Sequence, residues 1–232
     1  MTRVTARDNS NYCSGVQPWP RTEEEALAVQ DDLRSRVVSG NGPLAPATVA
    51  GLDVAYSEDD DRLAAAVVVL NTADLSVADT AVVRGRPAFP YIPGLFAFRE
   101  VPALMDALDR LTVRPDVLIC DGHGLAHPRR FGLAAHLGVL TDLPAFGVGK
   151  TRLVGDWEPV GEPRGARSAL VDAGETVGAV LRTQAGVKPV FVSVGHRIGL
   201  EPACELTLRL APRYRLPETT RAADRLCRDG LR

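Results

Sequence analysis

Two aspartates stand at positions where a buried carboxylate needs a cation or a hydrogen-bond network. Asp53 falls inside the run 48–56, whose apolar and β-branched residues predict a strand. Asp121 follows the apolar run 117–120 and precedes a glycine-rich turn, so it marks the end of a strand buried on both faces. Each aspartate alone also fits a structural role, on a half-exposed strand or at a turn cap. Because burial of an unpaired carboxylate is costly, two of them at adjacent strand positions of one sheet indicate a ligand site.

Glu100 and Lys150 add the remaining groups that phosphodiester hydrolysis requires. Glu100 lies near the start of a predicted helix, and Lys150 follows a predicted strand through Gly149. With the two aspartates, Glu100 supplies three hard oxygen ligands, which suit Mg²⁺ or Mn²⁺ better than zinc. A divalent ion held in this way generates hydroxide near neutral pH and absorbs charge on the leaving oxygen. Lys150 would orient the attacking water or neutralise the phosphate; without the carboxylates it would be interpreted as a surface lysine.

The segment 89–94, Phe-Pro-Tyr-Ile-Pro-Gly, predicts a stiff turn with Tyr91 and Ile92 at its tip, because its two prolines restrict the backbone. A rigid aromatic or apolar tip can insert between stacked bases and offset part of the cost of unstacking them. From sequence physics alone, the favoured alternative is a buried aromatic side chain that pins the loop. Both interpretations stay open at this point.

Two competing motifs in the same region fail on their spacing. Residues 149–151, Gly-Lys-Thr, imitate the end of a phosphate-binding Walker loop, but the first glycine that this loop requires falls at Pro144. His123 and His127 are four residues apart, as in helical zinc sites, yet the neighbouring glycines make the segment a poor helix and no glutamate follows His123. A kinase or ATPase therefore loses its main support, and a zinc hydrolase is disfavoured.

The overall composition narrows the class of protein. The 232 residues, 45% of them hydrophobic, suffice for one α/β domain with a full core. A net charge of −2 gives no global positive field, so any nucleic acid must be held by local arginine patches. Four scattered cysteines without C-x-x-C spacing argue against a zinc knuckle or a disulfide framework. Neither a membrane span nor a signal peptide is visible, so we expect a cytoplasmic protein without a membrane partner, and a monomer by default.

The elements expected around these residues form an α/β fold. Residues 1–20 are polar and predict a loose arm, followed by a single domain over residues 21–232. Thr22 would cap a first helix that ends near Gly40, and the next three strands predict an antiparallel meander. The predicted strands span residues 48–56, 63–70, 77–83, 116–120, 145–148, 169–172, 177–182 and 189–194, and further helices span residues 95–111, 204–210 and 220–228. A meander followed by alternating strands and helices is the order of an RNase H-like central mixed sheet flanked by helices, although many α+β folds share it.

Six separated motifs together point to one known family. They are VAGLDVAY (49–56), PYIPG (90–94) with FRE (98–100), CDGHG (120–124) through HPRRFG (127–132), residues 138–155, VGHRI (194–198) and LPE (216–218). In this order they resemble the endonuclease V family, from about residue 21 to the C-terminus; the arm, with Tyr12 and Trp19, lies outside the resemblance. Departures are small: Gly149 before the lysine, Val194 before Gly195, and Thr219 where a proline is usual.

The resemblance implies an RNase H-like fold and assigns roles in catalysis. Asp53 and Asp121 would bind Mg²⁺, or Mn²⁺, directly, and Glu100 would act through water on the metal. The match at Asp224 is weaker, since family members carry either an acidic residue or a histidine there. The catalytic residues implied by the resemblance are Asp53, Glu100, Asp121, His127, Lys150 and Asp224.

The resemblance also assigns nucleic-acid contacts. Tyr91 would lead a strand-separating wedge, the backbones of Gly94 and Gly122 would approach a flipped hypoxanthine, and Leu153 would line its pocket. The implied nucleic-acid-binding residues are Pro90, Tyr91, Ile92, Pro93, Gly94, Gly122 and Leu153.

The function implied is DNA repair. Such an enzyme recognises deaminated adenine, that is deoxyinosine in DNA, and hydrolyses the second phosphodiester bond 3′ to it, which leaves 3′-hydroxyl and 5′-phosphate ends. Inosine-containing RNA is an alternative substrate, because contacts that sense a 2′-hydroxyl leave no obvious motif. A non-catalytic reader of deaminated nucleic acid is the rival from another class, which the complete carboxylate set disfavours. A related RNase H-like nuclease for strand junctions or RNA is a third hypothesis.

Overall fold

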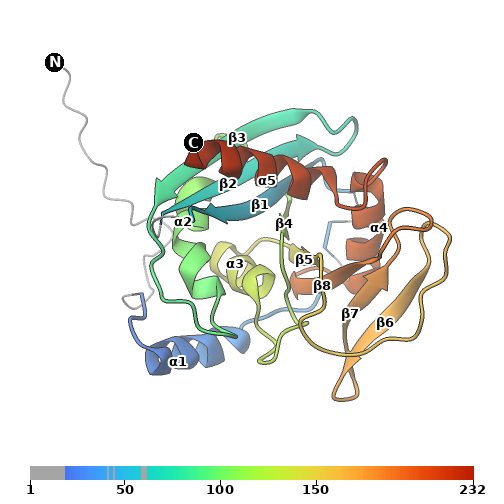
Figure 1. Cartoon of the computed structure of the whole chain (residues 1–232), viewed down its shortest axis with the longest axis horizontal. Helices are drawn as coiled ribbons and strands as arrows, with labels where there is room; N and C mark the ends of the chain where they lie inside the picture. Colours follow the sequence, from blue (N-terminus) through green and yellow to red (C-terminus); the bar gives the residue numbers. More distant parts are fainter. Residues whose placement is uncertain (1–18, 41, 44, 59–61) are drawn as a thin grey trace.

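A mixed sheet of eight strands organises the chain in the computed structural model, which describes residues 19–40, 42–43, 45–58 and 62–232. In chain order the strands are β1 (Thr48–Tyr56), β2 (Leu63–Asn71), β3 (Val77–Gly85), β4 (Val117–Cys120), β5 (Ala145–Gly149), β6 (Arg167–Asp172), β7 (Glu175–Leu181) and β8 (Val190–His196). They lie in the order β3-β2-β1-β4-β5-β8-β7-β6 (Figure 1). The predicted mixed sheet is confirmed, and no predicted strand boundary is wrong by more than two residues.

Strand β1 joins the two halves of this pattern. It pairs antiparallel with β2, which pairs antiparallel with β3, so the predicted meander is confirmed. On its other side β1 pairs parallel with β4, and β4 pairs parallel with β5. The carboxyl ends of β1, β4 and β5 therefore meet at one edge of the sheet, where open α/β sheets commonly bind ligands.

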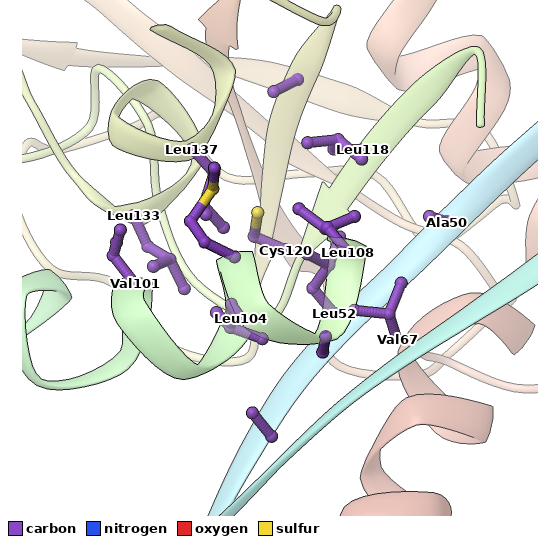
Figure 2. Packing of buried hydrophobic residues seen from close by; sticks show 14 of the residues in the cluster. Ala50, Leu52, Val67, Val101, Leu104, Leu108, Leu118, Cys120, Leu133 and Leu137 are labelled. Atoms are coloured by element: carbon purple, nitrogen blue, oxygen red, sulfur yellow. The ribbon is translucent and has the colours of Figure 1, made fainter. Parts of the chain in front are cut away.

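Helices cover both faces of the sheet. They are α1 (Glu23–Arg34), α2 (Ala97–Asp109), α3 (Leu133–Thr141), α4 (Leu200–Leu210) and α5 (Glu218–Leu231). Helices α2 and α3 pack on one face, and α4 and α5 pack on the other. Figure 2 shows Leu118 and Cys120 of β4 among the side chains of α2 and α3. Val117 and Ile119 face the opposite core, so this strand is buried on both faces, as its unbroken apolar run predicts.

The start of α5 packs directly on the backbone of β1. A Cβ atom at Gly51 would lie 2.2 Å from the carbonyl oxygen of Thr219, so only glycine permits this approach. The contact brings α5 across β1 and β2 and fixes the helix beside the strand that carries Asp53. The position where the family's usual proline is replaced by threonine is thus a fully buried packing contact.

The first helix ends earlier than the sequence predicts. Helix α1 stops at Arg34 and not near Gly40, with Ser35 as its C-terminal cap. Beyond it, the N–H of Val38 donates to His196 Nδ1 at 3.2 Å, and the N–H of Arg197 donates to the carbonyl of Val38 at 2.7 Å. These bonds to the end of β8 take the backbone groups that a longer helix would need. The apolar residue Val37 extends the helical pattern in the sequence but packs from a loop.

Helix α3 is absent from the elements predicted by sequence. Seven of its nine residues are buried, including Leu133, His136 and Leu137. A helix buried on nearly all sides has no polar face, so it lacks the amphipathic periodicity that identifies surface helices. The predicted helix 204–210 begins four residues later than α4. The predicted helix 220–228 lacks the first two and the last three residues of α5. Pro202 lies in the first turn of α4, where proline is tolerated although it suggests a helix boundary in the sequence.

Residues 1–18 of the predicted arm lie outside the described residues. Trp19, which the prediction included in that arm, packs against the domain. Its Nε1–H donates to the carbonyl of Phe98 at 3.1 Å, and its ring stacks on His136 with 5.8 Å between the ring centroids.

Among the described residues, no helix has the length and apolar character that crossing a membrane would require.

Candidate active site

Parallel pairing places Asp53 and Asp121 side by side. Leu52 of β1 lies opposite Cys120 of β4. Asp53 is the residue after Leu52 and Asp121 is the residue after Cys120, so the two aspartates are neighbours. The N–H of Asp121 donates to the carbonyl of Leu52 at 3.2 Å, which continues the ladder to the two acidic residues. The Asp53 carboxylate accepts the N–H of Val54 at 2.9 Å. Two carboxylates that come from distant parts of the sequence thus share one sheet edge.

Lys150 reaches the same edge from the next strand. Strand β5 lies parallel to β4 and ends at Gly149, one residue before the lysine. The ammonium of Lys150 forms an ion pair with Oδ2 of Asp121. Burial alone would lower the pKa of Lys150, but the hydrogen bond to Asp121 and the charges of Asp121, Asp53 and Asp224 raise it overall. The lysine is therefore a fixed positive charge beside the aspartate pair.

Glu100 approaches the pair from α2. It lies in the first turn of this helix and is buried, with Oε1 accepting the hydroxyl of Tyr56 at 3.4 Å. Burial raises the pKa of Glu100 to about 8, and the negative charges of Asp53 and Asp121 add to that shift. The ring of Tyr56 also lies under the guanidinium of Arg99, 5.1 Å from its centroid.

The aspartate pair carries negative charge that Lys150 compensates only in part. The pKa of Asp53 is raised to about 7, first by burial and then by the charges of Asp121 and Asp224, while the Val54 N–H and Lys150 act in the opposite direction. A cation between the carboxylates would remove this repulsion, and the donor set is all oxygen, which suits Mg²⁺ or Mn²⁺. The residues present therefore fit a hard divalent ion.

The described residues do not bring three metal ligands together. No three His, Cys, Asp or Glu side chains within this part of the chain lie close enough to hold a metal ion by themselves. The expectation that Asp53, Asp121 and Glu100 all share one cation is thus not met by the side-chain positions. The two adjacent aspartates form the core of the candidate site, and their charges act on Glu100.

Asp224 and His127 occupy the surroundings of the carboxylate pair. Asp224, on α5, is near enough for its charge to raise the pKa values of Asp53 and Lys150, and its carboxylate binds Arg228 at 2.7 Å. His127 is buried, and burial lowers its pKa to about 4, so its imidazole is neutral at pH 7. It contacts the backbone of Gly94, where the rigid segment ends.

A pocket of about 390 Å³ opens next to Glu100 and Asp121. Residues from the rigid segment and from the loops after β4 and β5 line it together. Of the residues predicted from sequence, those on its wall are Tyr91, Pro93, Gly94, Glu100, Asp121, Gly122, His127 and Leu153. Pro90 and Ile92 are not on that wall; Ile92 packs against the apolar cluster that contains Phe89 and Phe98. Asp53, Lys150 and Asp224 are not on that wall. Lys150 pairs with the wall residue Asp121, and Asp53 interacts through its charge with Asp121 and Asp224.

The rigid segment has a buried base and an exposed tip. Phe89 is buried and pins the loop, whereas Tyr91 is 68% exposed and meets the ring of Phe96 edge-on, 5.8 Å between centroids. The side-chain amide of Gln30 donates to the carbonyl of Gly94 at 3.2 Å, and Arg99 donates to the carbonyl of Phe89 at 3.0 Å. The buried aromatic residue that pins the loop is thus Phe89, whereas Tyr91 is exposed and its action as a wedge stays a prediction.

Close backbone contact holds the loop after β4 in place. A Cβ atom at Gly147 of β5 would lie 2.3 Å from the carbonyl oxygen of Gly122, so the loop lies flat on this strand. His123 then bonds through Nε2 to the carbonyl of Thr151 at 3.1 Å and ties the two pocket loops together.

Several contributors were missed by sequence reasoning. Tyr56 and Phe96 fit the apolar pattern of their segments, and Gln30 lies on a helix far from the motifs. The spacing of His123 and His127 suggests a zinc site, whereas His123 bonds to the backbone of Thr151. Tyr56 ends the strand that carries Asp53, so its hydroxyl at this position is a signal that the sequence does offer. The contact of Gln30 spans 64 residues of sequence and leaves no local pattern.

Comparisons with known proteins agree with the geometry. The family model of endonuclease V matches residues 31–225. A protein named endonuclease V from Streptomyces avermitilis is 55% identical over 92% of this chain and 94% of its own length, and a crystal structure of endonuclease V from that organism, with the same identity and coverage, has a TM-score of 0.89. A structure of Ciona intestinalis endonuclease V in complex with a 24mer DNA containing an inosine followed by a ribo-adenosine has a TM-score of 0.79 at 25% identity, over 90% of this chain and 97% of that one. The predicted family resemblance and RNase H-like fold are confirmed.

The raised pKa values predict a stability change with pH. A carboxyl whose pKa rises on folding stabilises the fold below its unfolded pKa, and this contribution is lost as the pH rises through the folded value. For Asp53 and Glu100 that window runs from about pH 4 to about pH 8. With chelator present, Asp53→Asn should raise the melting temperature at pH 8 by roughly 2–4 °C, the shift for about 1 kcal/mol in a domain of this size, and by less at pH 5.

The control is Asp31→Asn, which changes an aspartate on the surface of α1. Calorimetry of the three proteins at both pH values checks the prediction. An equal effect of Asp53→Asn at pH 5 and pH 8 would contradict it.

Proposed function

Since this chain belongs to the endonuclease V family, we propose that it recognises deoxyinosine in DNA and hydrolyses the second phosphodiester bond on the 3′ side of that nucleotide. The chain is an endonuclease, a hydrolase that acts on DNA. The proposed products carry 3′-hydroxyl and 5′-phosphate ends, and the proposed role is repair of deaminated adenine. The observation that carries the proposal is the aspartate pair with Lys150, placed beside a pocket that ends in an exposed aromatic tip.

The proposed cofactor is Mg²⁺, with Mn²⁺ as a substitute, held by Asp53 and Asp121. The ion would supply activation of water and neutralisation of charge on the scissile phosphate. Two observations support this proposal. The donor set is all oxygen, and repulsion from Asp121 is the second cause, after burial, of the raised pKa of Asp53. Asp224 is proposed to add negative charge near this pair, since its charge acts on Asp53.

Lys150 and Glu100 are proposed to prepare the phosphate and the water. The ammonium of Lys150, held against Asp121, is a fixed donor for a phosphate oxygen and would stabilise charge that grows in the transition state. The hydroxyl of Tyr56 orients the carboxylate of Glu100, which would hold the attacking water in line. Burial and the neighbouring aspartates raise the pKa of Glu100 to about 8, and a cation bound at the aspartate pair would favour its ionised form, which could then accept a proton of that water.

The pocket is proposed to hold the lesion base outside the helix. An enzyme that inspects a base extrudes it from the stack, at a cost of about a few kcal/mol. Tyr91 stands exposed on a loop that Gln30 and Arg99 anchor, so it suits a wedge that fills the vacated space. Gly94 and Gly122 present backbone without side chains to the pocket, and Leu153 supplies an apolar wall. His127, which is predicted to belong to the active site, would hold the rigid segment through Gly94.

RNA that contains inosine is the second candidate substrate. The observation in its favour is the ribo-adenosine after the inosine in the nucleic acid bound to the Ciona protein. A non-catalytic reader is disfavoured by the intact set of two aspartates, a glutamate and a lysine at one site.

Cleavage of defined oligonucleotides tests the proposal. With Mg²⁺, the protein should cut a duplex with one deoxyinosine at the second phosphodiester bond 3′ to it, and chelator should abolish the cut. Asp53→Ala and Asp121→Ala should each lower the cleavage rate by at least about 10³-fold while the fold is retained, because each removes a proposed metal ligand. Matched strands with adenine, with inosine in RNA, and with a branched junction measure specificity in parallel. Strong cutting by either folded variant, or equal cutting of the adenine strand, would refute the proposal.

Tyr91→Ala tests the wedge separately. Removing the exposed ring should weaken binding of inosine-containing duplex by roughly tenfold, since base–aromatic stacking contributes about 1–3 kcal/mol. Binding of the same lesion in single-stranded DNA should change less, because no second strand has to be separated. Tyr214→Ala, at another exposed tyrosine, is the matched control. Equal losses on single-stranded and duplex DNA would remove the wedge from the account.

A further inference from the structure

Arg215 makes three hydrogen bonds to backbone carbonyls beside the active site. Its Nη2 donates to the carbonyl of Lys150 at 2.6 Å and to that of Pro189 at 2.8 Å. Its Nε donates to the carbonyl of Lys188 at 2.9 Å. The guanidinium thus connects the loop between α4 and α5 with the end of β5 and the start of β8. None of the sequence motifs assigns a role to this residue.

The backbone at Lys150 has left the sheet. Strand β5 ends at Gly149, whose pairing with Phe191 is the last in the register with β8. From Lys150 onward the chain is irregular, so its carbonyl has no strand partner and depends on a side chain. Arg215 satisfies the carbonyl of Lys150, and His123 bonds to the carbonyl of the next residue, Thr151. Two side chains therefore fix the segment that carries the lysine.

The loop that presents Arg215 is itself anchored. The hydroxyl of Thr183 donates to the carbonyl of Arg215 at 2.6 Å. The side-chain amide of Gln184 donates to the carbonyls of Ala211 at 2.7 Å and Tyr214 at 3.3 Å. The guanidinium is thus held from a fixed base and acts as a rigid connection between two parts of the fold.

We propose that Arg215 is a positioning residue, which fixes the backbone of Lys150 so that the lysine ammonium is held at Asp121 in the reactive geometry. Lysine has a flexible four-carbon stem, so the location of its charge depends on where its main chain is held. A misplacement of about 1 Å in a catalytic group can cost on the order of 10²-fold in rate. Arginine suits the task because its planar fork reaches several carbonyls at once, which lysine does not do. The inference rests on the proposed catalytic role of Lys150.

A double-mutant cycle tests this connection. Rate constants for cleavage are measured in single turnovers with enzyme in excess, on inosine-containing duplex with Mg²⁺, and affinity is measured separately. Arg215→Ala should lower the rate constant by on the order of tenfold with little change in affinity, and Arg215→Lys should fall between wild type and Arg215→Ala. In a Lys150→Ala background, Arg215→Ala should cause no further loss, because the residue it positions is gone.

Arg164→Ala is the matched control. Arg164 bonds to the carbonyls of Leu208 at 2.7 Å and Ala211 at 3.2 Å. These carbonyls lie where α4 ends, at the other end of the α4–α5 loop from Arg215. This variant should lose thermal stability to a similar degree as Arg215→Ala and keep the wild-type cleavage rate constant. Circular dichroism melts identify any variant that does not fold, in which case Arg215→Lys carries the test.

Three outcomes would overturn the inference. They are an unchanged rate constant in Arg215→Ala, an equal rate loss in Arg164→Ala, and losses that add fully in the Lys150→Ala background. Full activity of Lys150→Ala would contradict both this inference and the proposed role of the lysine. A slow Lys150→Ala with a fast Arg215→Ala would contradict the positioning role alone.

Discussion

The repulsion between two carboxylates, fixed side by side by parallel strand pairing, is the constraint on which the rest of the site depends. The register of β1 and β4 places Asp53 and Asp121 at neighbouring positions. Neither can move away, because each belongs to a backbone held by the sheet. Such a pair needs positive charge, and the protein provides one in Lys150 from the next strand. The pKa of Asp53 is still raised, which indicates that Lys150 does not balance all of the negative charge at this edge. That excess negative charge makes the edge suitable for a divalent ion.

The packing around this edge explains how the fold maintains an unfavourable arrangement. Backbone approaches at Gly51 and Gly147 bring α5 and the loop after β4 into contact with the strands, where no side chain would fit. The cores on the two faces of β4 bury its residues completely. A rigid scaffold of this kind offsets the cost of the charged site, as is common where function requires groups that destabilise the fold. The pocket and the exposed Tyr91 then lie on anchored loops at a fixed distance from the carboxylates.

The strands and the two aspartates could be predicted from sequence because their signals are local. Asp53 interrupts an apolar run and Asp121 follows the end of one, and a carboxylate in such a place is itself an anomaly. Helix α3 could not be found in this way, since burial on nearly all sides removes its periodicity. The end of α1 is decided by hydrogen bonds to His196 and Arg197, more than 150 residues away. Tyr56, Gln30 and Arg215 contribute through tertiary contacts, which a single sequence does not reveal.

The most direct test of the central claim is a crystal structure of the protein grown with Mn²⁺, located by its anomalous scattering. We expect one ion between Asp53 and Asp121, with a carboxylate oxygen of each about 2.1 Å away, close to the distance that a hard divalent ion of this size adopts. The same crystals of Asp53→Asn should show that ion lost or weakly occupied. An ion bound elsewhere, or none at the aspartate pair at millimolar Mn²⁺, would contradict the account.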